Sequence, residues 1–129
     1  MKIENIKFKA KRIDGKGWVC GYFYEENGNT YIIENRQKES MLNRNVTYPV
    51  EPTTVCQFTG RKDSNGVDIY LGDIVEFKIP ISSNAKRGII VWADNLSALV
   101  LKYVLEDDWT YFYKGYKSQV VGNKFDKEK

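Results

Sequence analysis

Three consecutive carboxylates, Glu106, Asp107 and Asp108, form the densest acidic cluster of the sequence. Carboxylate oxygens bind Mg²⁺, and together with Asp94 the cluster could form a two-metal site of the kind that nucleases use. Adjacent side chains on a strand point to opposite faces, however, so at most two of these three could reach one ion. We therefore expect a solvated turn between two strands and no metal site.

The run Asp63-Ser64-Asn65-Gly66 begins like a calcium-binding loop, because it offers oxygen acceptors at its first and third positions. Its glycine comes too early, and the glutamate that closes such a loop is missing. The run is therefore expected to be a hairpin turn.

The two cysteines, Cys20 and Cys56, give little support to nucleophilic catalysis. A thiol needs a base to become a thiolate at neutral pH, and the sequence has no histidine to supply one. The glycine-rich loops that hold nucleotide phosphates are also missing. We expect no enzyme and no cofactor, and we interpret both cysteines as free thiols on strands, in a reducing compartment.

The basic N-terminus indicates a more specific function, nucleic-acid binding. Six basic residues lie within the first sixteen positions, opposed only by Glu4 and Asp14. Lys7, Lys9 and Lys11 would share one face of a strand, because side chains alternate along it. Alternatively, these lysines form a solvated face or protect a strand edge from pairing with another chain.

Aromatic residues near the C-terminus could offer stacking surfaces to bases, since small barrels bind single-stranded nucleic acids on exposed aromatics beside cations. The residues that suit this role are Trp109, Tyr111, Tyr113, Lys114, Tyr116 and Lys117. Tyr111 and Tyr113 share one strand face. That face is either part of a core or an exposed platform, and the sequence leaves both open.

The chain of 129 residues is large enough to bury a core without disulfides or metals, and its apolar share of 42% fits a globular protein. Its net charge of +3, from 20 basic and 17 acidic residues, is too small to require a polyanionic partner. The N-terminal residues alternate apolar and charged side chains and lack the apolar core of a secretory signal. No apolar run approaches the roughly 20 residues of a membrane helix, so we expect a cytoplasmic protein without membrane contact.

Short runs of aromatic and β-branched residues, separated by Gly, Asn and Asp, predict an all-β fold. The expected strands are residues 6–10, 18–24, 30–34, 55–58, 67–70, 74–79, 87–93, 98–105, 109–113 and 118–122. In the first of these, Ile6, Phe8 and Ala10 share one face, and the lysines between them face water.

Connecting segments suggest how the strands are arranged. Asn27-Gly28 predicts a tight hairpin, while Pro49 and Pro52 favour an edge or linker segment over residues 46–55. Residues 35–45 are polar and form either a solvated loop or one helical turn. We expect an N-terminal β-rich part over residues 1–70 and a C-terminal part over residues 71–129, although the two could form one compact unit. The five short strands after Gly72 have the count and spacing of a small SH3-like barrel.

Residues 54–74 read TVCQFTGRKDSNGVDIYLGDI. This run resembles the signature of the YopX family of small phage and prophage proteins. The matching positions are Thr54, Val55, Gln57, Phe58, Thr59, Gly60, Asp63, Gly66, Ile69, Tyr70, Gly72, Asp73 and Ile74. The N-terminal IKFKAKRIDGKGWVCGYFY and the C-terminal VVGNKFD are also similar to segments of the family, with Lys11 where an aromatic residue is common.

The resemblance implies an all-β protein with an N-terminal β-barrel-like part and a C-terminal SH3-like part, encoded by a phage or an integrated prophage. It implies no known activity. The residue types of the signature suit a scaffold, because its glycines tolerate positive φ in turns, and Asp63 and Asp73 can accept hydrogen bonds from nearby backbone amides. Phe58 and Tyr70 are expected to be core or cross-strand partners.

Two functions remain after these exclusions. We favour a noncatalytic interaction module that presents its loops or a sheet edge to a phage or host protein, or to another copy of itself. The alternative is weak nucleic-acid binding, for which the candidate residues are Lys7, Lys9, Lys11, Trp109, Tyr111, Tyr113 and Lys114. A metal-dependent enzyme using the acidic cluster comes third.

Overall fold

A computed structural model of the chain describes residues 2–35, 45–81, 84–113 and 116–126. The regular structure of these residues is almost entirely β, with two three-residue 3-10 helices, Ile3–Asn5 and Pro52–Thr54. None of the helices that the structure describes has the length and apolar character needed to cross a membrane. Of residues 35–45, expected to be a loop or a helical turn, Asn35 and Asn45 lie in strands, and residues 36–44 lie outside the described residues.

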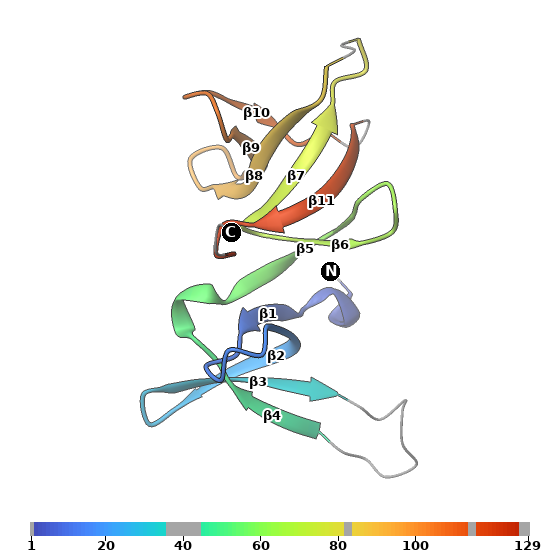
Figure 1. Cartoon of the computed structure of the whole chain (residues 1–129). Helices are drawn as coiled ribbons and strands as arrows, with labels where there is room; N and C mark the ends of the chain where they lie inside the picture. Colours follow the sequence, from blue (N-terminus) through green and yellow to red (C-terminus); the bar gives the residue numbers. More distant parts are fainter. Residues whose placement is uncertain (1, 36–44, 82–83, 114–115, 127–129) are drawn as a thin grey trace. The chain divides into compact units, whose positions relative to one another are not determined.

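Strands account for every segment that the sequence predicts to be one. They are β1 (Phe8–Lys11), β2 (Trp18–Glu26), β3 (Asn29–Asn35), β4 (Asn45–Pro49), β5 (Cys56–Lys62), β6 (Asp68–Tyr70), β7 (Asp73–Lys78), β8 (Lys86–Ala93), β9 (Ala98–Tyr103), β10 (Trp109–Tyr111) and β11 (Lys117–Asn123). They form two antiparallel sheets, in the orders β4-β3-β2-β1-β5-β6 and β10-β9-β8-β7-β11 (Figure 1). The all-β class is therefore confirmed, and β4, which ends in a proline, lies at a sheet edge as expected.

The chain divides into two compact units, Met1–Phe58 and Thr59–Lys129. The division lies earlier in the chain than the one expected between residues 70 and 71. The reason is the short strand β6, because its Ile69 is fully buried in the core of the second unit together with Val75 and Phe77. The hairpin of β5 and β6 thus contributes to the second core.

The first unit is built around Ala10, Val19, Ile32 and Val50, which are all buried. Ala10 faces Val19 across β1 and β2, so the alternation expected for the first strand holds at Ala10. The β2–β3 hairpin closes through Asn27 and Gly28, whose φ angles of 52° and 80° are those of the tight turn that the Asn-Gly pair predicts. An antiparallel bridge joins Arg12, the residue after β1, to Val50, the residue after β4. This bridge brings β1 and the edge strand β4 together at one end, so the sheet is curved.

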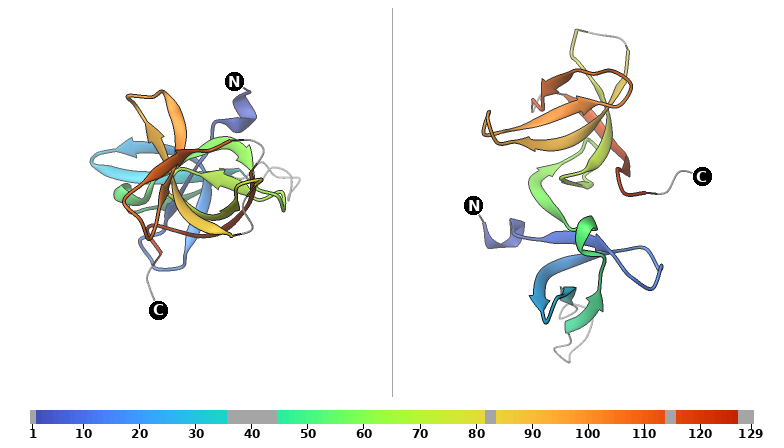
Figure 2. Two further views of the ribbon diagram at one scale, coloured as in Figure 1. Left: turned by 90° about the horizontal axis from the view of Figure 1, so that it is seen from above. Right: turned by 90° about the vertical axis from the view of Figure 1, so that its left-hand side faces the viewer.

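The second unit is a meander of β7, β8, β9 and β10, and β11 returns to pair with β7. The β8–β9 hairpin and the returning β11 are drawn in orange and red in Figure 2. The core of this unit consists of Ile69, Val75, Phe77, Ile90, Leu101 and Phe112. Its strands point alternate side chains inward, which leaves the other set of side chains on an outer face.

Candidate interaction surface

Three exposed aromatic side chains, Trp109, Tyr111 and Tyr113, follow one another along β10 and the residues after it; we call them the aromatic row. Their exposed fractions are 46%, 36% and 53%. Trp109 and Tyr111 meet edge to face with ring centroids 5.2 Å apart, and the rings of Tyr111 and Tyr113 lie 5.9 Å apart. Of the two alternatives that the sequence leaves open, the structure shows the exposed platform.

Strand alternation positions this row. Phe112 points the opposite way and is only 7% exposed in the core of the second unit, and its N–H donates a 3.1 Å hydrogen bond to the carbonyl of Leu99. Arg61 holds the same residue from another strand, because its Nη1 donates to the Phe112 carbonyl and its Cζ lies 3.9 Å from the ring centroid. Burial lowers the pKa of the Arg61 guanidinium. No local pattern in the sequence marks Arg61 for this role.

Tyr116 is a support for the row and not a member of it. Its half-buried ring stacks on Phe77, with centroids 5.6 Å apart, and meets Tyr113 edge to face at 5.4 Å. Of the two alternatives for the C-terminal aromatic residues, exposed stacking surface or core, Tyr116 takes the second, because its ring packs against the core. Lys114 lies outside the described residues, and Lys117 is exposed at the start of β11, opposite Lys78.

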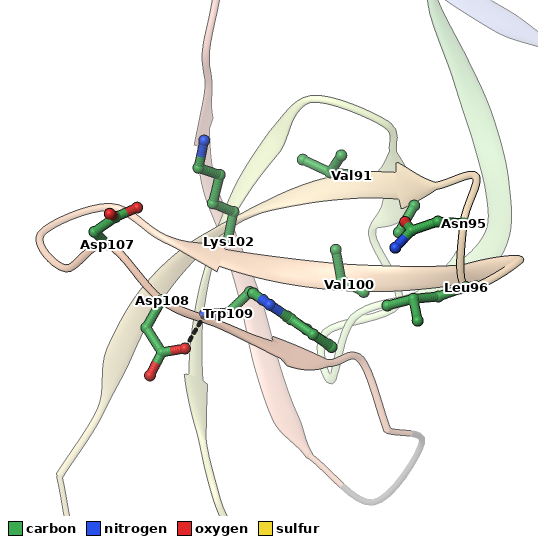
Figure 3. Close-up of a pocket in the computed structure, with 9 residues that line it drawn as sticks. Val91, Asn95, Leu96, Val100, Lys102, Asp107, Asp108 and Trp109 are labelled. Atoms are coloured by element: carbon green, nitrogen blue, oxygen red, sulfur yellow. Dashed lines mark hydrogen bonds between the residues drawn. The ribbon is translucent and has the colours of Figure 1, made fainter.

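Trp109 also forms one wall of a shallow pocket of about 220 Å³ on the outer face of β8 and β9; we call it the Trp109 pocket (Figure 3). Its apolar lining consists of Val91, Ala93, Leu96, Val100 and Trp109. Val100 pairs with Val91 on one side and with Tyr111 on the other. Three neighbouring strands thus place apolar side chains on one surface beside the aromatic row.

The polar lining of the pocket includes Lys102, which pairs with Trp109 across β9 and β10, and the carboxylates of Asp107 and Asp108. Oδ1 of Asp108 accepts a 2.8 Å hydrogen bond from the backbone N–H of Trp109. Figure 3 shows this bond where the acidic loop leads into β10. The charged groups that line the pocket are therefore two carboxylates and one ammonium group.

The acidic cluster is an exposed turn, as the sequence predicts. Glu106 forms a 3.4 Å ion pair with Lys86, and the turn joins β9 to β10. Asp94 is exposed in the separate turn between β8 and β9. In the described part of the chain, no three Asp, Glu or Cys side chains gather in a way that could hold a metal ion.

Lys7, Lys9 and Lys11, which we call the basic face, lie in the first unit over aromatic rings. The Nζ atoms of Lys9 and Lys11 are 5.0 and 5.6 Å from the ring centroid of Trp18, and Nζ of Lys7 is 4.4 Å from that of Phe58. All three lysines are only partly exposed, so the expectation of lysines facing water is wrong in part. The aromatic row belongs to the second unit, so the residues expected to form one nucleic-acid site are divided between the two units.

The signature aspartate Asp63 holds two parts of the second unit together. Its Oδ1 accepts hydrogen bonds from the backbone N–H groups of Asn65 and Val67 at 2.8 and 2.9 Å, as expected for a hairpin turn. Its Oδ2 accepts a third from Val120 of β11 at 2.9 Å. Burial raises the pKa of this carboxyl, but the three backbone hydrogen bonds outweigh it, and the net shift is downward.

The other signature residues also make contacts that hold strands and turns. Asp73 is fully buried and accepts from the backbone N–H of Tyr70 at 2.8 Å, and Thr59 Oγ1 donates to the Ile69 carbonyl at 2.7 Å. Phe58 and Tyr70 are buried, and Gln57 is exposed. The signature glycines Gly60, Gly66 and Gly72 all have positive φ.

The signature thus spans the junction of the two units and both aspartate-held turns. The family model described as YopX protein matches residues 2–128 of this chain. The chain belongs to the YopX family. The match covers both units, so the YopX resemblance seen around residues 54–74 extends to the whole fold. A comparison with curated proteins gives no match.

Proposed function

We propose that this YopX-family chain is a noncatalytic interaction module, which binds a protein partner or a second copy of itself through the outer face of its second unit. The observation that carries the proposal is the aromatic row beside the apolar Trp109 pocket. Large apolar surfaces left exposed on a folded chain commonly mark binding sites, and Trp and Tyr are enriched among the residues that contribute most to interface energies.

The noncatalytic part of the proposal rests on the side chains that could do chemistry. The sequence has no histidine, and Cys56 is buried with its thiol donating to the carbonyl of Thr54. The acidic cluster has structural contacts, since Glu106 pairs with Lys86 and Asp108 caps the start of β10. These contacts favour a folded scaffold over a catalytic centre.

The finer description of the fold and its setting is part of the same proposal. The strand order β10-β9-β8-β7-β11 supports an SH3-like barrel in the second unit, and the bridge between Arg12 and Val50 supports a barrel-like first unit. Both cysteines are free, which suits a reducing compartment such as the cytoplasm of a bacterial host. Family membership favours a phage or prophage origin.

A triple variant of the aromatic row, W109A with Y111A and Y113A, tests the proposal. Trp92 supplies the matched control, because it is 48% exposed, close to the 46% of Trp109, but does not line the Trp109 pocket. Affinity capture from a bacterial extract identifies partners, and light scattering measures self-association. We expect wild type and W92A to share a partner or a dimer that the triple variant loses. Identical partners and identical mass for all three proteins would rule out the row as the binding surface.

The basic face favours a second candidate function, nucleic-acid binding by the first unit. Two ammonium groups lie over one indole at Trp18, so cations and an aromatic surface occur together there. Fluorescence anisotropy of labelled single- and double-stranded oligonucleotides tests it at low and physiological salt. Phosphate contacts predict a steep loss of affinity with salt, and loss of binding in the K7E/K9E/K11E variant. Absence of binding at low salt would exclude this candidate.

A further inference from the structure

We propose that the Trp109 pocket binds an arginine or lysine side chain from an extended segment of a protein partner. The proposal rests on the proposed function, because it takes the aromatic row as the binding surface and names the chemistry of what binds there. It follows from three properties of the pocket: its apolar walls, the sign of its charged groups and its place at the edge of a sheet.

The walls suit a side chain with a long apolar stem and a cationic head. Val91, Val100 and Trp109 line the pocket from three neighbouring strands, and Leu96 lies at the opposite end of the pocket from Asp107 (Figure 3). Arginine and lysine bury their methylene groups along such surfaces while keeping the charge near water. Indole is the aromatic ring that binds cations most strongly, and 46% of Trp109 is exposed to receive one.

The charged groups of the pocket favour a positive ligand. Asp107 and Asp108 line the pocket with Lys102 as the opposing charge. The hydrogen bond from the backbone N–H of Trp109 to Asp108 Oδ1 holds that carboxylate beside the residue whose indole would bind the cation. A guanidinium beside the indole could therefore reach a carboxylate, whereas a phosphate group would meet two negative charges against the one positive charge of Lys102.

The edge position favours an extended partner. β10 ends the order of its sheet, so an extended segment can run beside it, while the backbone N–H of Trp109 already donates to Asp108. Along such a strand, side chains on the same face recur about every 6.8 Å. The rings of the aromatic row are 5.2 and 5.9 Å apart, so alternate side chains of one extended segment can each meet a ring of the row. The cationic residue would lie at Trp109 and its neighbours at Tyr111 and Tyr113.

Fluorescence anisotropy with a labelled peptide of alternating arginine and threonine tests the proposal on the full chain. The matched probe has citrulline in place of arginine, because citrulline keeps the shape and removes the charge. We expect the arginine peptide to bind about tenfold more tightly than the citrulline peptide. W109A is expected to lose about tenfold in affinity and D107N about threefold.

Control variants separate a local effect from a loss of folding. W92A removes an indole of similar exposure, and E26Q removes an exposed carboxylate in the first unit, so both are expected to bind the peptide like wild type. D107N changes an exposed loop side chain and leaves the apolar packing of Trp109 in place. A change in the peptide affinity of D107N therefore reports the loss of the negative charge at position 107 alone.

Equal affinity for the arginine and citrulline peptides, or unchanged binding by both W109A and D107N, would overturn the proposal. A single-stranded oligonucleotide that competes for Trp109 would overturn it in favour of nucleic acid. Self-association that W109A abolishes, without binding of the arginine peptide, would overturn the inference and leave the proposed function standing. Absence of peptide binding, together with partners and a mass that the W109A/Y111A/Y113A variant leaves unchanged, would remove the inference and the proposed function together.

Discussion

Asn123 donates a 2.9 Å hydrogen bond from its Nδ2 to Oδ1 of Asp73, and both side chains are buried. The two residues face each other where β7 begins and β11 ends. The other carboxylate oxygen of Asp73 accepts from the backbone N–H of Tyr70, while Oδ1 of Asn123 accepts from that of Phe125. This pair thus joins the turn before β7 to the end of the last strand.

Exchanging the two residues tests this pairing. D73N places two amides face to face and is expected to lower the free energy of unfolding by about 1–3 kcal/mol, because a buried donor loses its acceptor. The double variant D73N/N123D restores one donor and one carboxylate and is expected to recover most of that loss. Urea unfolding of the two single variants and the double variant measures the coupling. Additive losses would show that the pair does not interact as described.

Asp63 makes stability depend on pH in the acidic range. The pKa of Asp63 in the folded chain lies below the ordinary value of 3.8. At pH values between the folded pKa and 3.8, the unfolded chain therefore binds more protons than the folded chain. Its contribution is therefore fully present above pH 3.8 and is lost as the pH falls through the folded pKa. We expect the stability difference between wild type and D63N, measured by urea unfolding, to shrink on acidification through this range. A stability difference between wild type and D63N that grows on acidification would show that folding raises the pKa of Asp63, which contradicts the prediction.

Phe112 and its neighbour Tyr113 should differ sharply in their effect on stability. Phe112 is 7% exposed and Tyr113 is 53% exposed. F112A is expected to lower the free energy of unfolding by about 3–5 kcal/mol, because it leaves a cavity in the core. Y113A is expected to change it by less than about 1 kcal/mol. Urea or thermal unfolding measures both, and similar losses would contradict the alternation that places the row outside.

Gly21 is expected to resist substitution because β3 approaches it closely. A Cβ atom at this position would overlap the backbone carbonyl of Ile33, whereas a Cβ at Gly28, in the β2–β3 turn, would meet open space. G21A is therefore expected to destabilise the first unit by more than about 2 kcal/mol, and G28A by about 1 kcal/mol from its positive φ alone. Unfolding followed by circular dichroism compares the two, and equal losses would contradict the close approach.

Local sequence patterns predicted the strands and many of the turns. The alternation over residues 109–113 correctly placed Tyr111 and Tyr113 on one face, and the Asp63 turn follows from residues close in sequence. Whether that face is exposed depends on the sheet order, in which β10 ends a sheet. This order is set by pairing between distant segments, and no local pattern contains it.

Contacts between residues far apart in the sequence could not be predicted from local sequence patterns. The bond from Asn123 to Asp73 and that from Arg61 to the Phe112 carbonyl each join distant segments of the chain. The same holds for Lys7, which was expected to face water but lies over Phe58, a residue brought close when β5 pairs with β1. The period-two pattern gave the face of each strand, and the neighbouring strand decided what covers it.

Site-specific photo-crosslinking tests the central claim, that the aromatic row binds a protein, most directly. The photoreactive p-benzoylphenylalanine replaces Tyr113 in one protein and Tyr22 in another, since Tyr22 is an exposed tyrosine of the first unit. We predict a defined crosslinked product from position 113 inside bacterial cells, reduced when W109A is added, and none from position 22. No product from position 113, or the same product from both positions, would contradict the account.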